Sequence, residues 1–447
     1  MSAELFALLL FISTFGFLLL GYPVAFTLGG GALLFAALGY WAGEFDLFFL
    51  QALPDRIWGL VLNETLIAIP LFIWMGVILE RSQIASELLS ELEFRLRRVR
   101  GGLALSVTLV GGILAASTGI VGATVVTLGL LALPTLIRSG TSPALASGLI
   151  AATGTLGQLI PPSIVLIVLG DAISSAHQQA QLSLGNFAPD AVTVGDLFLG
   201  ALVPGGFLMV AYALYALWVE RKRPQKPEEE ATHDTPRSFF KSIGAPMLLI
   251  LLVLGSILLG VATPTEASAL GALGAASLTA WQRRLPRAVF LETLDHTVRI
   301  TAMIFSILIG ASLFSLVFRG FNGDEWIAQH LSVFSGSPNM ALLLVMLAFF
   351  LMGFFLDFFE IVFVMVPIVG PPLLRMGFDP VWLGILFALN LQTSFLTPPF
   401  GFSLFYLRGV LPESISTATL YRGVIPFILI QILAIAVFWI WPEALIR

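Results

Sequence analysis

Long apolar segments, separated by short polar stretches, run along almost the whole chain. A segment of about 20 apolar residues is long enough to cross the hydrocarbon core of a bilayer as one helix. The pattern therefore predicts an all-α polytopic membrane protein. Two amphipathic and charged segments, 81–100 and 284–297, predict helices lying in the membrane interface. We predict ten spans, at residues 4–20, 24–40, 60–79, 144–170, 196–218, 244–260, 264–281, 297–317, 381–407 and 419–441.

Two further apolar stretches, 102–136 and 339–374, do not fit this count. Each has about 35 residues, or roughly 50 Å as a helix, which is too long for one crossing of about 30 Å and short for two. Small or polar residues interrupt each stretch at its middle, so we predict a re-entrant hairpin of two half-helices in each. The interrupting residues are Ser117, Thr118 and Gly119 in the first stretch, and Gly353 and Asp357 in the second.

One phrase with a double proline after a Thr-containing stretch occurs twice, each time inside an apolar segment. The sequence reads TGTLGQLIPPS at 153–163 and LQTSFLTPPFG at 391–401. Two prolines remove two backbone donors and break the helix. Lipid supplies no water to satisfy the freed carbonyls, so such a break must line a site enclosed by protein. Paired interrupted segments are typical of the midplane binding site of secondary transporters.

Landmarks of the two halves recur at nearly the same offset, and Pro23 and Pro264 are 241 positions apart. Pro134 and Pro371 are 237 positions apart, and so are Pro161 and Pro398. This offset predicts two repeats, joined by a polar cytoplasmic linker at 219–243. The repeats are residues 1–218, with hairpin 102–136 and broken helix 144–170, and residues 244–447, with hairpin 339–374 and broken helix 381–407.

Basic residues cluster after the third, fifth and seventh predicted spans. Cytoplasmic loops are enriched in Lys and Arg, so these three sides are expected in the cytoplasm. The loop 171–195 contains no Lys or Arg, and 319–337 contains only Arg319, so both are expected on the outer side. Both chain termini are then periplasmic, and the two halves have inverted topology.

Composition agrees with a membrane protein and narrows the chemistry. Hydrophobic residues make up 58% of the chain and charged residues 11%, against about 25% charged residues in soluble domains. Cysteine is absent, which excludes disulfides and thiolate chemistry. There is no G-x-x-x-x-G-K-[ST] motif, which argues against a nucleotide-driven pump.

Other functional classes fit the pattern less well. An intramembrane hydrolase needs a buried general base, whereas we expect all four histidines in loops or interfacial segments, so no enzymatic activity and no catalytic residue is predicted. A channel agrees with the composition, but two inverted halves around broken helices favour alternating access. The histidines are His177, His233, His296 and His330.

The helix breaks permit ion and solute binding. Unwound backbone offers carbonyls to a hard cation, and the N-terminal ends of half-helices offer N–H groups to an anion. We expect each hairpin tip to face the broken helix of its own half, the first tip facing Thr153 and its neighbours. The candidate sodium ligands are Ser117, Thr118, Gly119, Thr155, Gly157, Gly353, Asp357, Gln392, Thr393 and Thr397, and the candidate substrate contacts are Ser163, Asn390, Pro398 and Ser403.

Three carboxylates lie in or beside apolar segments. Asp357 and Glu360 are at i and i+3 and share one face of the second hairpin. Intramembrane carboxylates are costly, which makes Asp357 a candidate for ion binding or site organisation. Glu360 is open to a capping role, and Glu266 in TPTEAS is a candidate first-turn carboxylate favoured by the helix dipole.

Four motifs together resemble the large membrane subunit of the tripartite ATP-independent periplasmic (TRAP) transporters. They are TGTLGQLIPPSIVLIVLGD, MGFFLD, PIVGPPLLRMGFDP and LTPPFGFSLF. The resemblance covers essentially the whole chain. It implies an elevator-type transport domain, built from the hairpins and broken helices, that slides against a scaffold domain. It also implies sodium ions as the coupling ions with no other cofactor.

The resemblance further implies two partners in the bacterial inner membrane system. These are a small four-helix membrane subunit, expected as a separate chain, and a periplasmic solute-binding protein that delivers a small organic acid. The alternative is a single-component sodium- or proton-coupled carrier of the wider ion-transporter superfamily that works without a binding protein.

At two places this chain departs from the family motifs, which limits the site residues that the resemblance can assign. Many members have a Ser-Ser pair near the first hairpin tip and Gly-x-Asn-Leu after the second double proline. This chain has Ser117-Thr118-Gly119 and Gly401-Phe402-Ser403-Leu404 instead. Backbone contacts at the breaks depend less on the side chain, so we expect them at Thr155, Gly157, Thr397 and Pro398.

Overall fold

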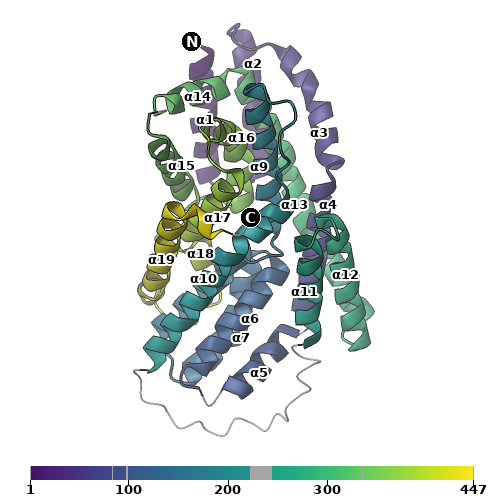
Figure 1. Cartoon of the computed structure of the whole chain (residues 1–447), viewed down its shortest axis with the longest axis vertical. Helices are drawn as coiled ribbons and strands as arrows, with labels where there is room; N and C mark the ends of the chain where they lie inside the picture. The colour runs from purple at the N-terminus through teal and green to yellow at the C-terminus, as the bar shows by residue number, and fades with distance from the viewer. Residues whose placement is uncertain (1, 83, 97–98, 222–243, 335, 446–447) are drawn as a thin grey trace. The chain divides into compact units, whose positions relative to one another are not determined.

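The structure is a computed structural model that describes residues 2–82, 84–96, 99–221, 244–334 and 336–445. The side chains of 84–86 and 117–118 lie outside this description, as does most of the predicted linker 219–243 together with His233. Within the described ranges every regular element is a helix and no strand occurs, as predicted (Figure 1).

The helices follow one another along the chain with short connections. Their bounds are α1 Ala3–Leu19, α2 Val24–Trp41, η1 Leu47–Ala52, α3 Leu53–Val61, α4 Glu64–Arg81, α5 Ile84–Leu96, α6 Gly102–Thr118, α7 Val121–Arg138, α8 Pro143–Thr155, η2 Leu156–Gln158, α9 Ile164–Ser183, α10 Val194–Arg221, α11 Ala245–Leu258, α12 Pro264–Trp281, α13 Arg287–Gly320, α14 Gly323–Ser332, α15 Pro338–Met352, α16 Phe358–Arg375, α17 Pro380–Leu396, α18 Phe402–Arg408, α19 Thr417–Ile440 and η4 Pro442–Ala444.

Several helices begin where the sequence supplies a capping side chain. The hydroxyls of Ser142 and Ser416 accept hydrogen bonds from backbone N–H groups in the first turns of α8 and α19. Thr263 and Glu266 form a capping box at the start of α12. Each cap satisfies donors that have no partner inside the helix. The predicted first-turn place of Glu266 is therefore confirmed.

The fold consists of two compact units. The first unit is Met1–Ile67, Ile167–Thr193 and Arg299–Phe387, and the second is Ala68–Leu166, Val194–Val298 and Ala388–Arg447. Each unit therefore combines segments from both halves of the sequence. The division into two inverted repeats stays a prediction.

Six described helices are long and apolar enough to cross a membrane. The pair formed by 47–61 and 64–81, bent by 52°, is a seventh candidate, and five shorter apolar helices have 10–17 residues. Every predicted span overlaps helix, but several of the helices are shorter than a full crossing. The chain is thus a multi-pass helical protein, while the count of ten spans stays a prediction.

Two expectations about helix boundaries are wrong. The predicted interfacial helix 284–297 and span 297–317 form one continuous helix, α13, because neither proline nor glycine occurs between Arg287 and Gly310. Polar residues alone do not end a helix. The broken segment continues in α9 as far as Ser183, so part of the predicted outer loop is helical. His177 and His330 lie in helices, α9 and α14, rather than in loops, and the interfacial location of His296 stays a prediction.

Both predicted hairpins are interrupted where the sequence indicated. In the first, α6 ends at Thr118, Gly119 adopts a left-handed conformation with φ of 62°, and α7 begins at Val121. In the second, residues 353–357 separate α15 from α16. The interruptions are observed, and re-entrant insertion into a membrane stays a prediction.

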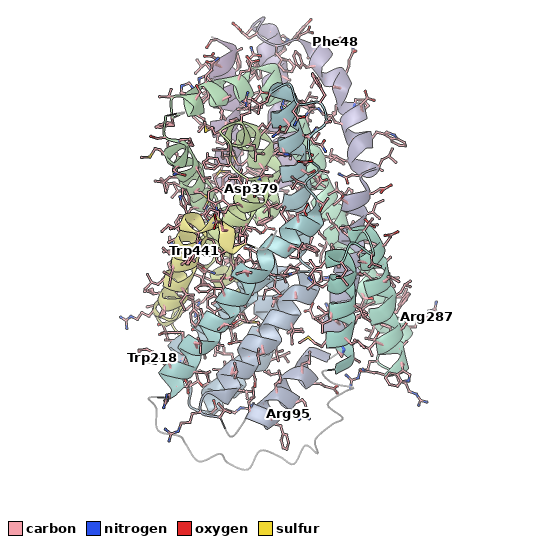
Figure 2. All side chains as sticks on the ribbon, viewed as in Figure 1. Phe48, Arg95, Trp218, Arg287, Asp379 and Trp441 are labelled. Carbon is pink, nitrogen blue, oxygen red and sulfur yellow. The ribbon has the colours of Figure 1, made fainter. Side chains whose placement is uncertain are left out.

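In the second unit, α8 is the buried centre. All residues from Leu145 to Thr155 are buried, and α6, α7 and α19 pack against the helix. Figure 1 shows α6 and α7 side by side in this unit. Trp218 and Trp441 are exposed, and Figure 2 shows Trp218 with Arg95 in the lower part of the unit and Trp441 in its upper part. Tryptophan rings favour the two membrane–water interfaces.

In the first unit, aromatic rings pack around a glycine. Phe321 stacks on Phe6, with ring centroids 5.3 Å apart, and tilts against Phe45. Gly39 of α2 lies against the Phe321 ring with no space for a side chain. Small residues allow helices to approach closely in a membrane, where packing rather than water exclusion drives association.

Candidate functional site at the two helix breaks

The first break lies between α8 and α9. The chain makes one short 3-10 turn, η2, then passes through a cis Pro161–Pro162 bond before α9 begins. Ser163 Oγ lies 2.8 Å from the carbonyl oxygen of Gly157 and 3.1 Å from that of Gln158. Its single proton is shared between these two acceptors. A buried hydroxyl thus satisfies carbonyls that the prolines leave without a helical donor. The predicted contact between Ser163 and substrate stays a prediction.

The second break, between α17 and α18, is built in the same way. It contains a cis Pro398–Pro399 bond, and the buried Ser403 Oγ donates to the Phe395 carbonyl over 3.0 Å. Thr393 and Thr397 donate back to helix carbonyls, over 2.8 and 2.7 Å. Each hydroxyl keeps its lone pairs for a further donor or a cation.

The tip of the first hairpin touches the first break through backbone. A Cβ atom on Gly119 would lie 3.0 Å from the Ile164 nitrogen, and one on Gly157 would lie 2.8 Å from the Ala115 carbonyl oxygen. Glycine is required at both places because no side chain fits. The predicted approach of this tip to the broken helix is therefore observed. Ser117 and Thr118 form the last turn of α6, and their side chains lie outside the described part of the structure.

A buried polar cluster joins the ends of α8 and α17. Gln392 Nε2 donates to Thr155 Oγ1 over 3.2 Å, and Gln431 Nε2 of α19 lies 3.5 Å from the same oxygen. The hydroxyl of Tyr212 lies beside Thr155 and Gln431. All four side chains are completely buried. We call this group the amide cluster.

Sequence reasoning found Thr155 and Gln392 but missed Tyr212 and Gln431. Both missed residues lie in apolar stretches of their helices and are far along the chain from the two breaks. A lone glutamine in the apolar run that follows Arg422 was the one available signal, because a buried amide needs a hydrogen-bonding partner.

Asp357 and Glu360 form a capping box at the start of α16. Asp357 Oδ1 accepts a hydrogen bond from Phe358 N over 2.7 Å, and Glu360 Oε2 accepts one from Asp357 N over 3.1 Å. The capping role left open for Glu360 is therefore observed. Gly353 and Asp357 belong to the first unit, whereas their predicted partners Asn390, Gln392, Thr393 and Thr397 belong to the second. That pairing stays a prediction.

The groups at the two breaks offer oxygen atoms as ligands. Among the described residues no group of three or more His, Cys, Asp or Glu side chains gathers to hold a metal ion. What the breaks provide is hydroxyl, amide and carbonyl oxygen, which hard cations prefer.

A solved structure shares this fold. The transporter YdaH of Alcanivorax borkumensis superposes with a TM-score of 0.62 over 89% of this chain and 88% of that one, at 16% identity. The two chains thus share a multi-pass helical fold. Residues 11–444 match the family described as the tripartite ATP-independent periplasmic transporter, DctM component. The chain belongs to this family, as the resemblance of its motifs predicted.

Two curated relatives illustrate the family. The C4-dicarboxylate TRAP transporter large permease protein DctM of Pseudomonas aeruginosa is 30% identical over 371 residues, covering 82% of each chain. The sialic acid TRAP transporter large permease protein SiaM of Vibrio cholerae is 27% identical over 432 residues, covering 96% of this chain and 95% of that one. This chain is therefore similar to large permease proteins over nearly its full length.

Proposed function

We propose that this chain is the sodium-driven large permease of a TRAP transporter. It receives a small organic acid from a periplasmic binding protein and moves it across the inner membrane by an elevator motion. Both termini lie on the periplasmic side, and a small membrane subunit enlarges the scaffold. No enzymatic step is involved.

The observation that carries the proposal is the construction of the two breaks. Each combines a double proline, a buried serine that satisfies the freed carbonyls, and threonine oxygens close by. Thr155 and Gln392, 237 positions apart like the two double prolines, meet directly. Partly unwound backbone enclosed by protein is the setting in which transporters bind sodium. The substrate class rests on the acids that the names of the two relatives give.

The test is uptake into proteoliposomes that contain the chain and its small membrane subunit. Labelled C4-dicarboxylate and sialic acid are offered with the cognate binding protein under an inward sodium gradient. We expect uptake at least tenfold above that with an equal potassium gradient. Equal uptake under the two gradients would contradict sodium coupling.

The same assay separates the single-component alternative. Omitting the binding protein should reduce uptake to background. Undiminished uptake without it, at equal solute concentration, would support a carrier that works alone. Uptake that depends on a pH gradient and not on the sodium gradient would mean that protons are the coupling ion.

A further inference from the structure

Gln431 of α19 is a buried amide side chain in an apolar stretch of the helix. It is the only amide or charged side chain between Gly423 and Ile440, it is completely buried, and its side-chain oxygen makes no hydrogen bond among the described residues. A buried amide oxygen without a hydrogen-bond partner is costly. The amide nitrogen lies 3.5 Å from Thr155 Oγ1, which is 276 positions away at the end of α8.

The chemistry of Thr155 fixes the orientation of the amides around it. Thr155 Oγ1 donates its single proton to the Ala152 carbonyl over 2.7 Å. The hydroxyl oxygen can then only accept, so both Gln392 and Gln431 must present N–H groups to it. Two amides on different helices therefore hold one hydroxyl from two sides.

α19 packs along α8 as far as the first break. A side chain on Gly423 would collide with the Ala144 carbonyl, and one on Gly148 would collide with Gly423. Gln431 then reaches Thr155, eight residues beyond Gly423 and seven beyond Gly148. The two helices run side by side in the same direction, and Gln431 contacts α8 at its last residue before the 3-10 turn.

Tyr212 of α10 closes the cluster. Its ring meets the Phe427 ring edge-on, with centroids 5.2 Å apart at 86°, and Phe427 lies one helical turn before Gln431. The Tyr212 hydroxyl faces Thr155 and Gln431. The Tyr212 and Phe427 rings thus form an aromatic pair beside Gln431.

We propose that Gln431 is a positioning residue for the sodium site at the first break. Together with Gln392 it holds the Thr155 hydroxyl, and with it the end of α8 and the first peptide groups of η2. The negative end of the α8 dipole lies at this point and favours a cation. The inference rests on the proposed function, because it assigns a role at the sodium site.

Replacing Gln431 by methionine tests the role, because methionine has a similar length and no N–H group. In the reconstituted complex, Gln431→Met should raise the sodium concentration for half-maximal uptake at least threefold. The maximal rate at saturating sodium should stay within a factor of two. The matched control is Gln329→Met on α14, where the side chain is exposed, and there both values should be unchanged.

A double-substitution cycle tests whether Gln431 acts through Thr155. Thr155→Val removes the accepting hydroxyl and should itself raise the half-maximal sodium concentration. Adding Gln431→Met to Thr155→Val should then raise it no further, and Thr155→Ser should restore most of the affinity. Multiplying effects of the two substitutions would overturn the proposal.

The failure of the inference and that of the proposed function are distinguishable. If uptake by the unaltered complex is equal in sodium and potassium, the proposed function fails and the inference fails with it. If that uptake depends on sodium but Gln431→Met leaves the half-maximal concentration unchanged, the positioning role alone is overturned. Should Gln431→Met not fold, Gln431→Asn, whose amide is one methylene too short to reach Thr155, takes its place with the same expected shift.

Discussion

Gly148 of α8 and Gly423 of α19 approach so closely that a methyl group on either would overlap the backbone of the other helix. Both helices end their contact at the amide cluster, so this approach sets how α19 meets the first break. Overpacking of a rigid interior is destabilising.

Gly148→Ala should therefore lower the stability of the purified chain by about 1–3 kcal/mol, measured as a decrease in melting temperature. Gly206→Ala on α10 is the matched control, because nothing lies within 4 Å of the Cβ position there. That control should be neutral or stabilising, since alanine favours helix over glycine. Equal melting temperatures for the two variants would mean that α8 and α19 can move apart slightly without loss of stability.

Gly119→Ala should destabilise the first hairpin for two reasons, a left-handed backbone and the lack of space beside Ile164. Gly185→Ala isolates the first reason, because Gly185 has φ of 82° with nothing within 4 Å. The left-handed conformation alone costs about 1–2 kcal/mol for a residue with a side chain. The decrease in melting temperature should thus be clearly larger for Gly119→Ala. A larger decrease for Gly185→Ala would show that the tip relaxes freely.

Asp357→Asn should separate capping from ion binding. Asparagine caps helices as well as aspartate does, so expression and melting temperature should stay as they are. Sodium-dependent uptake should decrease at least tenfold. Asp357→Ala also removes the cap and should lower stability by about 1 kcal/mol. Normal uptake by Asp357→Asn would remove the carboxylate from the mechanism and leave it as a cap.

Two Arg–Glu pairs in the second unit should differ in their contribution to stability. Arg284 pairs with Glu87, with side chains 29% and 12% exposed, and also donates to the Ser82 carbonyl. Arg81 pairs with Glu292, with side chains 44% and 53% exposed. Water screens the exposed pair, which is worth at most about 1 kcal/mol. Arg284→Gln should thus lower the melting temperature measurably and Arg81→Gln should not. Equal effects would contradict this ranking.

The sequence predicted the breaks well because the signals there are local. The double prolines at 161–162 and 398–399 lie where the helices break, and Gly119 and Gly353 mark the hairpin interruptions. A double proline alone is not decisive, because Pro371 and Pro372 lie inside the continuous helix α16. The family, the all-helical architecture and the positions of most helices followed from the same patterns. The ligand roles assigned to the residues at the breaks stay predictions.

Two kinds of feature were not predicted from the sequence. One depends on packing between residues far apart in the chain, and the other on the ability of a helix to continue from polar into apolar surroundings. The amide cluster joins residues 237 and 276 positions apart, and no local pattern encodes such a pairing. α13 looked divisible because its first turns are charged and its later turns apolar. A helix without proline or glycine accepts that change of surroundings along its length.

The 34 residues of α13 form a rod of about 50 Å, whereas the hydrocarbon core of a bilayer is about 30 Å thick. A helix of that length cannot be hidden in lipid at any ordinary tilt, so at least one end must emerge into headgroups or water. The charged turns near Glu292 are the natural part to emerge. Since the chain contains no cysteine, single cysteines stepped along α13 would react with a water-soluble maleimide against no background and would locate the membrane surface residue by residue.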